Sequence, residues 1–239
     1  MTPPRVPLFD FPDIVLHADE LEVKRHAQYQ AAKAGDFMAA AALVGEFIND
    51  DSARQLETML AGRAAALVPI HALESGGVNE IPAELTKLLS RQLGLPVNRS
   101  IVQSNSVGHT GASGFKRLAH QAVFVGEVQP QGLYFLVDDF VGQGGTLANL
   151  VGFITSEGGH VLGATVLTGK AYSAKLAPDD ALIQALRDKH GTEFEQWWQQ
   201  HFGFGFDCLT RSEARYLEKS PDARTIRDRL IAAGFESGS

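Results

Sequence analysis

Residues 134–147 constrain the fold of this chain more than any other segment, and they read Tyr-Phe-Leu-Val-Asp-Asp-Phe-Val-Gly-Gln-Gly-Gly-Thr-Leu. The apolar run at the start is typical of a strand that is buried on both faces of a parallel sheet. Two adjacent carboxylates, Asp138 and Asp139, follow the run, and a glycine-rich turn then leads into a helix expected over residues 146–156. The order of strand, diacid, turn and helix predicts an α/β fold with a binding site at the end of the strand.

The glycine-rich turn has a chemical meaning of its own. It consists of Gly142, Gln143, Gly144, Gly145 and Thr146. Backbone N–H groups in such a turn, with the positive end of a helix dipole behind them, form a seat for phosphate. Carboxylates facing that phosphate would repel it, so we expect Asp138 and Asp139 to hold an uncharged, hydroxyl-rich group beside it. The segment predicts a ribose 5-phosphate site; the alternative is a turn that only packs a helix close to the sheet.

The stretch from Leu136 to Thr146 resembles the phosphoribosyl pyrophosphate (PRPP) motif of type I phosphoribosyltransferases, in which a strand and two acids precede Thr-Thr-Gly-Gly-Thr. The resemblance implies that Asp138 and Asp139 bind the ribose hydroxyls and that residues 142–146 wrap the 5-phosphate. It also implies Mg²⁺, with the two aspartates as candidate ligands, and a homodimer. Gly142 and Gln143 replace the family's two threonines, so two hydroxyl donors are lost while an amide donor is kept.

The loop that follows the first expected core strand is the candidate seat for the leaving pyrophosphate. It is small and rich in glycine, and it resembles the family's pyrophosphate loop in position. The residues assigned to it are Glu74, Ser75, Gly76 and Gly77. Because the Glu74 carboxylate would repel pyrophosphate directly, we assign that residue a magnesium-binding or structural role. An ordinary strand-to-helix connection is the alternative.

Residues 103–117 are rich in glycine and serine and end in Lys116 and Arg117. They occupy the place of the family's mobile catalytic loop, which closes over the sugar. Such a lid excludes water from a reactive, cationic sugar, and a basic side chain can neutralise charge on the departing pyrophosphate. Lys116 and Arg117 are therefore predicted catalytic residues, and a surface loop with solvated charges is the alternative.

The sequence says least about the acceptor base. Lys170 follows an expected strand, near where some purine enzymes of the family place a base-binding lysine, and a solvated lysine is an equal alternative. Several aromatic residues in the C-terminal region could stack on a base, but their helical spacing favours a plain hydrophobic core. These aromatic residues are Phe194, Trp197, Trp198, Phe202, Phe204 and Phe206.

Composition narrows the classes of function. The net charge of −7 and the lack of a Lys/Arg run argue against nucleic-acid binding. A single cysteine, Cys208, cannot form an internal disulfide and suits a reducing cytoplasm. No apolar stretch is long enough to cross a membrane, no signal peptide is apparent, and the scattered histidines do not favour a zinc site. We therefore expect a cytoplasmic protein that acts on small molecules.

Strand and helix patterns divide the chain into three parts. Residues 1–62 form an N-terminal arm and helical extension, residues 63–176 an α/β core, and residues 177–239 a C-terminal helical region that is a possible hood over the base. Strands are expected over residues 14–16, 64–70, 96–102, 123–125, 133–137 and 161–168. Helix starts are expected at Ser52 with Gln55, at Thr192 with Glu195 and at Thr210 with Glu213. Alternating strands and helices with short turns predict a doubly wound, mainly parallel sheet.

The function predicted from these features is that of a phosphoribosyltransferase, a glycosyltransferase of the pentosyltransferase class. It would transfer the 5-phosphoribosyl group of PRPP to a nitrogen base and release pyrophosphate. One alternative is a non-catalytic regulator that binds PRPP or a nucleotide; Gly142 and Gln143 favour it, and Lys116 and Arg117 do not. Another is a hydrolase or phosphorylase acting on a ribose phosphate, for which the sequence offers no dedicated base besides the diacid.

Overall fold

The computed structural model describes residues 3–70, 73–74, 77–105 and 113–235 of the chain. Its strands are β1 (Val15–Ala18), β2 (Ala66–Pro69), β3 (Leu73–Glu74), β4 (Gly77–Val78), β5 (Val102–Gln103), β6 (Phe124–Val125), β7 (Leu133–Val141) and β8 (His160–Gly169). Four parallel strands form the central sheet in the order β1–β8–β7–β2, while β3–β4 and β5–β6 are antiparallel pairs. The predicted mainly parallel sheet is confirmed.

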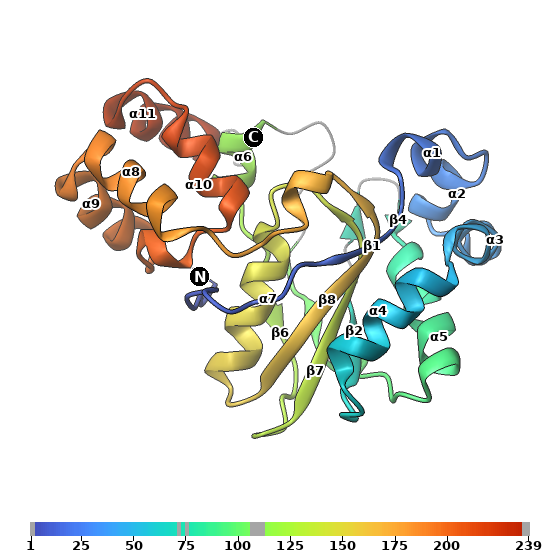
Figure 1. The fold of residues 1–239 in the computed structure, drawn as a ribbon. Helices are drawn as coiled ribbons and strands as arrows, with labels where there is room; N and C mark the ends of the chain where they lie inside the picture. The colour runs from blue at the N-terminus through green and yellow to red at the C-terminus, as the bar shows by residue number, and fades with distance from the viewer. Residues whose placement is uncertain (1–2, 71–72, 75–76, 106–112, 236–239) are drawn as a thin grey trace.

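Helices cover both faces of this sheet. They are α1 (Glu20–Arg25), α2 (Tyr29–Lys33), α3 (Phe37–Phe47), α4 (Asp50–Leu60), α5 (Ile81–Leu93), α6 (Gly114–Ala119), α7 (Gly145–Ser156), α8 (Asp180–His190), α9 (Thr192–Phe202), α10 (Arg211–Glu218) and α11 (Ala223–Phe235), with short 3-10 turns η1 (Ala171–Ser173) and η2 (Phe206–Cys208). Figure 1 shows α7 on one side of the sheet and α4 and α5 on the other. The fold is therefore a doubly wound α/β sandwich of three layers.

Strand β7 lies in the middle of the sheet and has apolar side chains on both faces. Leu136 packs into the core shared with α7, whereas Phe135 and Val137 pack into the core shared with α3, α4 and α5. Each of these three side chains is at most 1% exposed. Burying a side chain of this size stabilises the fold by roughly 1.5–3 kcal/mol, so these three residues contribute strongly to the packing of β7 between the two helical layers.

The C-terminal helices α8–α11 form a lobe beside the sheet, and α6 packs with them (Figure 1). Phe115 and Leu118 of α6 belong to the same hydrophobic core as Trp198, which is fully buried. The predicted aromatic core of this region is confirmed, since Phe194, Phe202, Phe204 and Phe206 are at most 5% exposed. Because α6 carries Lys116 and Arg117, the position of these basic residues depends on the C-terminal lobe.

Two strand predictions need correction. Strand β7 does not end at Val137 but continues through both aspartates to Val141, because Phe140 and Val141 still pair with β8. The diacid therefore lies within the last part of the strand rather than after it. The strand expected over residues 96–102 is reduced to one parallel bridge between Val97 and Leu67 and to the short β5, which pairs with β6.

Two of the predicted helix caps are also wrong, although the helix expected at Thr192 does begin there. Helix α4 is capped by Asn49, whose side chain accepts from the Ser52 amide at 2.9 Å. Ser52 lies inside the helix and its hydroxyl bonds the ring of His17 instead. Helix α9 follows Gly191, whose φ of 79° suits glycine, and no side chain caps it. The predicted capping box of Thr210 and Glu213 is confirmed.

Candidate functional site

Asp138 and Asp139 lie side by side near the carboxyl end of β7 and are each 8% exposed. The two carboxyl groups lie close enough to interact electrostatically. The Asp139 amide donates to Asp138 Oδ1 at 2.8 Å. Burial, and then the neighbouring Asp139 carboxylate, raise the pKa of Asp138 well above its usual range. The diacid therefore holds a proton more readily than two separate aspartates would.

Lys33 at the end of α2 is a site residue that the sequence analysis missed. Its Nζ atom donates to Asp139 Oδ2 at 2.9 Å. The side chain of Lys33 is 17% exposed and that of Asp139 is 11% exposed, so the ion pair lies at the edge of the fold rather than deep inside it. A lone lysine in the last turn of a five-residue helix carries no local signal for such a role.

The glycine-rich turn joins β7 to α7 as predicted. Gly144 has a φ of 80°, a conformation that strongly favours glycine, and it is the N-cap of α7. The Ala148 amide donates to the Gly144 carbonyl at 3.0 Å and so closes the first intrahelical bond. The amides of Gly145, Thr146 and Leu147 precede that bond, and a helix leaves such amides available to an outside acceptor. This end of α7 therefore has the geometry of an anion seat.

Arg117 of α6 lies against this turn, which is the expected seat of the 5-phosphate rather than of the pyrophosphate to which the sequence analysis assigned it. A Cβ atom added at Gly142 would lie 2.6 Å from Arg117 Nη1. A side chain at this position would therefore displace the guanidinium. The close approach gives a physical reason for glycine at a place where the resembling family usually has threonine.

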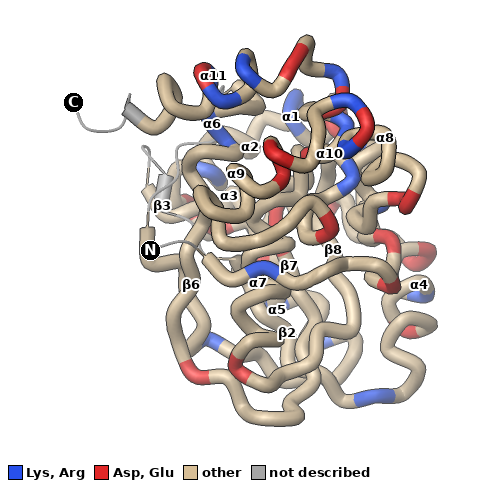
Figure 2. Tube along the Cα trace, turned by 90° about the vertical axis from the view of Figure 1, so that its left-hand side faces the viewer, with Lys and Arg blue, Asp and Glu red and all other residues tan. Residues whose placement is uncertain are grey.

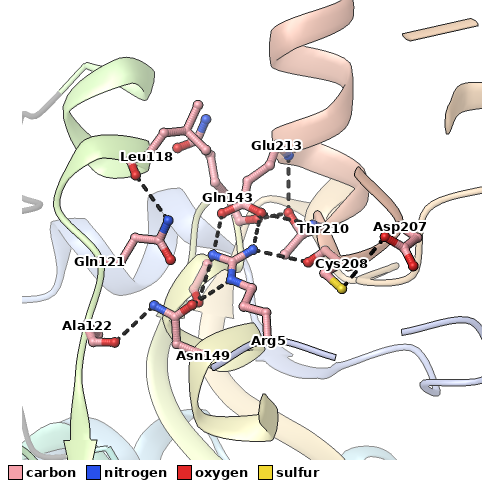
Figure 3. Close-up of polar contacts among 11 residues, drawn as sticks. Arg5, Leu118, Gln121, Ala122, Gln143, Asn149, Asp207, Cys208, Thr210 and Glu213 are labelled. Carbon is pink, nitrogen blue, oxygen red and sulfur yellow. Dashed lines mark hydrogen bonds and ion pairs between the residues drawn. The ribbon is translucent and has the colours of Figure 1, made fainter. Parts of the chain in front are cut away.

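The other side of the turn is closed by the C-terminal lobe (Figure 3). Thr210 Oγ1 donates to the Gln143 carbonyl at 2.5 Å. A Cβ atom added at Gly145 would lie 2.6 Å from Glu213 Oε1, so the carboxylate of α10 packs directly on the start of α7. Small residues in the turn thus serve close packing as well as access to the amides.

Arg5 from the N-terminal arm completes this contact. It donates to both carboxylate oxygens of Glu213, at 2.6 and 2.9 Å, and through Nε to Asn149 Oδ1 of α7 at 2.6 Å (Figure 3). The side chains of Arg5 and Glu213 are only 1% and 3% exposed. This buried cluster joins the arm, α7 and α10 at the glycine-rich turn, and sequence analysis identified only its capping box.

The remaining predicted residues lie at the periphery of this arrangement. The backbone of Glu74 and Gly77 pairs in the β3–β4 hairpin, whereas Ser75 and Gly76 lie outside the described residues. Lys116 lies next to Arg117 on α6. Lys170 follows β8, and its ammonium lies 3.7 Å from a carboxylate oxygen of Glu20. The structure brings the diacid, the turn and Arg117 together in one region, and leaves Lys170 paired with α1.

Charge and cavities complete the description. Figure 2 shows basic residues mainly in the upper half of the molecule, around α1, α2, α6 and α11. Within the described part of the chain, no group of three or more His, Cys, Asp or Glu residues could hold a metal ion, and no helix could cross a membrane. A hollow of about 640 Å³ lies beside β1 and α4, lined by residues such as Ile14 and Met59, and includes none of the predicted site residues.

The chain is similar in sequence to known proteins, but it matches only part of the length of each. The chain is 40% identical over 233 residues to Protein TraN of Escherichia coli, which covers 98% of this chain and 52% of that protein. It is 36% identical over 148 residues to an uncharacterized protein of Haemophilus influenzae, covering 62% of this chain and 33% of that protein. The chain thus spans 52% and 33% of the length of these two curated relatives, and no family model matches it.

Solved structures with a similar arrangement include adenine phosphoribosyltransferases. One covers 66% of this chain and 82% of its own, with a TM-score of 0.38 and 12% identity. The enzyme of Rhodothermus marinus matches 51% of this chain and 69% of its own, with a TM-score of 0.34 and 14% identity. The enzyme of Leishmania tarentolae matches 62% of this chain and 91% of its own, with a TM-score of 0.33 and 12% identity. Scores this low carry no argument about activity, so the site rests on the geometry described above.

Proposed function

We propose that this protein transfers the 5-phosphoribosyl group of PRPP to a nitrogen base and releases pyrophosphate. One observation carries the proposal: a buried diacid on β7 is followed at once by a glycine-rich turn at the start of α7. Carboxylates and free helix amides at the same strand end suit a ligand with neighbouring hydroxyl and phosphate groups. The resemblance of residues 136–146 to the PRPP motif supports the same ligand.

In this proposal, Asp138 and Asp139 bind the ribose hydroxyls. The Asp139 carboxylate accepts a hydrogen bond from one hydroxyl. Asp138, which is more readily protonated, can donate as well as accept. The amides at the start of α7 and the Arg117 guanidinium hold the 5-phosphate through charge-assisted hydrogen bonds. Both ends of the sugar are then fixed, and positioning of this kind is the main catalytic contribution that we expect from the protein.

Departure of the pyrophosphate requires positive charge on the opposite side of the sugar. Lys116 and the loop residues Ser75, Gly76 and Gly77 are the proposed contacts, and Glu74 keeps its proposed magnesium-binding or structural role. Mg²⁺ is usually held by one or two carboxylates together with ligand phosphates, so Asp138 and Asp139 fit an ion that arrives with PRPP but not a resident metal site. The ion would supply neutralising charge on the pyrophosphate. Lys170 remains the proposed base contact, and a homodimer and a cytoplasmic location remain predictions.

A regulator that binds PRPP or a nucleotide without catalysis is the second candidate. The observation that favours it is the ion pair between Lys33 and Asp139, which satisfies a carboxylate that a ribose hydroxyl would otherwise use. The replacement of two threonines by Gly142 and Gln143 points the same way.

Pyrophosphate release separates these functions. The purified protein is incubated with PRPP and Mg²⁺, alone and with each common purine and pyrimidine base. Release that depends on one base supports the transferase. Release without any base indicates a hydrolase, and PRPP binding without release indicates the regulator. If PRPP neither binds nor is consumed, the proposed sugar-phosphate site is wrong.

A further inference from the structure

A second cluster of charged and aromatic side chains lies next to the diacid. Phe140 follows Asp139 directly on β7, and its side chain is half-buried. The ammonium of Lys24 on α1 lies 4.4 Å from the centre of the Phe140 ring, within the range of a cation–π interaction. Lys24 also donates to Glu20 Oε1 at 2.6 Å, and the other carboxylate oxygen of Glu20 lies 3.7 Å from the Lys170 ammonium. The cluster thus joins α1, β7 and the segment after β8.

The sheet places this cluster at the same edge as the diacid. Because β1, β7 and β8 are parallel, their carboxyl ends meet at one edge, where ligands of open α/β sheets bind. Thr168 of β8 pairs with Ala18 of β1 on one side and with Phe140 on the other. The Lys170 amide donates to the Val141 carbonyl at 3.1 Å. The backbone that carries the cluster is therefore fixed by the register of three strands.

The cluster presents positive charge and aromatic surface to a ligand. The single carboxylate of Glu20 serves both ammonium groups, and the side chains of Lys24 and Lys170 are 41% and 43% exposed. The nearby Asp19 carboxylate caps α1, since it accepts from two backbone amides of that helix. Tyr172 is 58% exposed, and its ring centre lies 5.9 Å from the Lys170 ammonium. A planar ring with a negative substituent complements such a surface.

We infer that Lys24 and Lys170 are specificity-determining residues that select a heteroaromatic acceptor carrying a carboxylate; this inference rests on the proposed function. In the transfer, an electron pair of a ring nitrogen forms the bond to the anomeric carbon as the bond from that carbon to pyrophosphate breaks. The pyrophosphate leaves with the electron pair of the old bond, and the proton of the nitrogen passes to solvent. The acceptor must therefore lie beside the ribose, and the cluster lies beside the diacid that is proposed to hold the ribose.

Orotidine 5′-monophosphate and uridine 5′-monophosphate are the probes, because they share the ring, the ribose and the phosphate, and only the first carries a carboxylate on the ring. Isothermal titration of the wild-type protein should show a preference for orotidine 5′-monophosphate of at least about tenfold, the value of one hydrogen bond between charged groups. Lys24→Met and Lys170→Met should each reduce this preference severalfold and change the affinity for uridine 5′-monophosphate by less than about threefold. General damage to the fold would weaken both nucleotides equally.

Two further variants keep the test decisive. Glu20→Gln removes the carboxylate that competes for both ammonium groups, so it should raise the affinity for orotidine 5′-monophosphate at least about threefold and leave that for uridine 5′-monophosphate unchanged. Damage to the fold cannot imitate such a gain. Lys87→Met is the matched control: it removes a lysine that is 46% exposed and pairs with Glu84 within α5, and it should leave both affinities unchanged.

The outcomes separate the inference from the proposed function. Equal affinity of the wild-type protein for the two nucleotides, or an unchanged preference in both lysine variants, overturns the inference. Binding of ribose 5-phosphate without binding of either nucleotide also overturns it and leaves the proposed sugar-phosphate site standing. If ribose 5-phosphate and PRPP fail to bind as well, the proposed function itself is wrong.

Discussion

The buried pair of Arg5 and Glu213 offers a quantitative test of how the C-terminal lobe is fixed to the glycine-rich turn. Arg5 makes two bonds to the Glu213 carboxylate, and both side chains are almost completely buried. Removing one partner of such a pair leaves an uncompensated buried charge and typically costs about 3–5 kcal/mol. Arg5→Met and Glu213→Gln should each show a loss of this size. The double variant buries no unpaired charge, so its loss should be at least about 2 kcal/mol smaller than the sum of the single losses.

Urea unfolding of the four proteins measures the coupling between the two sites. The exposed pair of Lys175 and Asp179, whose side chains are 43% and 41% exposed, is the matched control and should couple by less than about 1 kcal/mol. A coupling between Arg5 and Glu213 as small as that of the control would show that the buried pair does not hold the lobe in place. The free energy of unfolding should depend on urea concentration with the same slope in all variants, since only then does a shifted midpoint report a change in stability.

Two other predictions concern acid stability and the turn. Burial lowers the pKa of His17 from 6.5 to about 4, so between these pH values the unfolded chain binds a proton that the folded chain does not. The free energy of unfolding should therefore fall by about 3 kcal/mol as the pH drops from 6.5 to 4. Urea unfolding of His17→Gln should lack this loss. Gly142→Ala should push Arg117 away and weaken ribose 5-phosphate binding about tenfold in titration calorimetry. Gly45→Ala, on α3 with no atom nearby, should leave that affinity unchanged, and equal effects of the two alanines would refute the role of the turn.

Features encoded by neighbouring residues could be predicted from the sequence. The central strand and the helix after it depend on a continuous apolar run and a glycine turn, and both occur where expected. The sequence placed Gly144 in the glycine-rich turn, and its positive φ explains why glycine stands at this position. The end of β7 was misplaced because two aspartates usually end a strand, whereas pairing of Val141 with Gly169 extends it. Asn49 was missed as a cap because Ser52 offered a competing capping signal.

Contacts between distant segments could not be predicted. The pairing of Lys33 with Asp139 and of Arg5 with Glu213 spans 106 and 208 residues, and no local pattern links the partners. Arg117 was proposed from its place at the end of a glycine- and serine-rich stretch, but its contact with Gly142 depends on how α6 packs on the C-terminal lobe. The candidate site is thus built on one local motif, and its other walls come from tertiary packing.

The most direct test of the central claim is isothermal titration of the purified protein with PRPP and Mg²⁺, in parallel with the Asp138→Asn/Asp139→Asn variant. Circular dichroism and the unfolding midpoint establish that the variant is folded. The proposed site predicts saturable binding with one PRPP per chain, lost in the double variant. No binding by the wild-type protein, or equal binding by the folded variant, would contradict it.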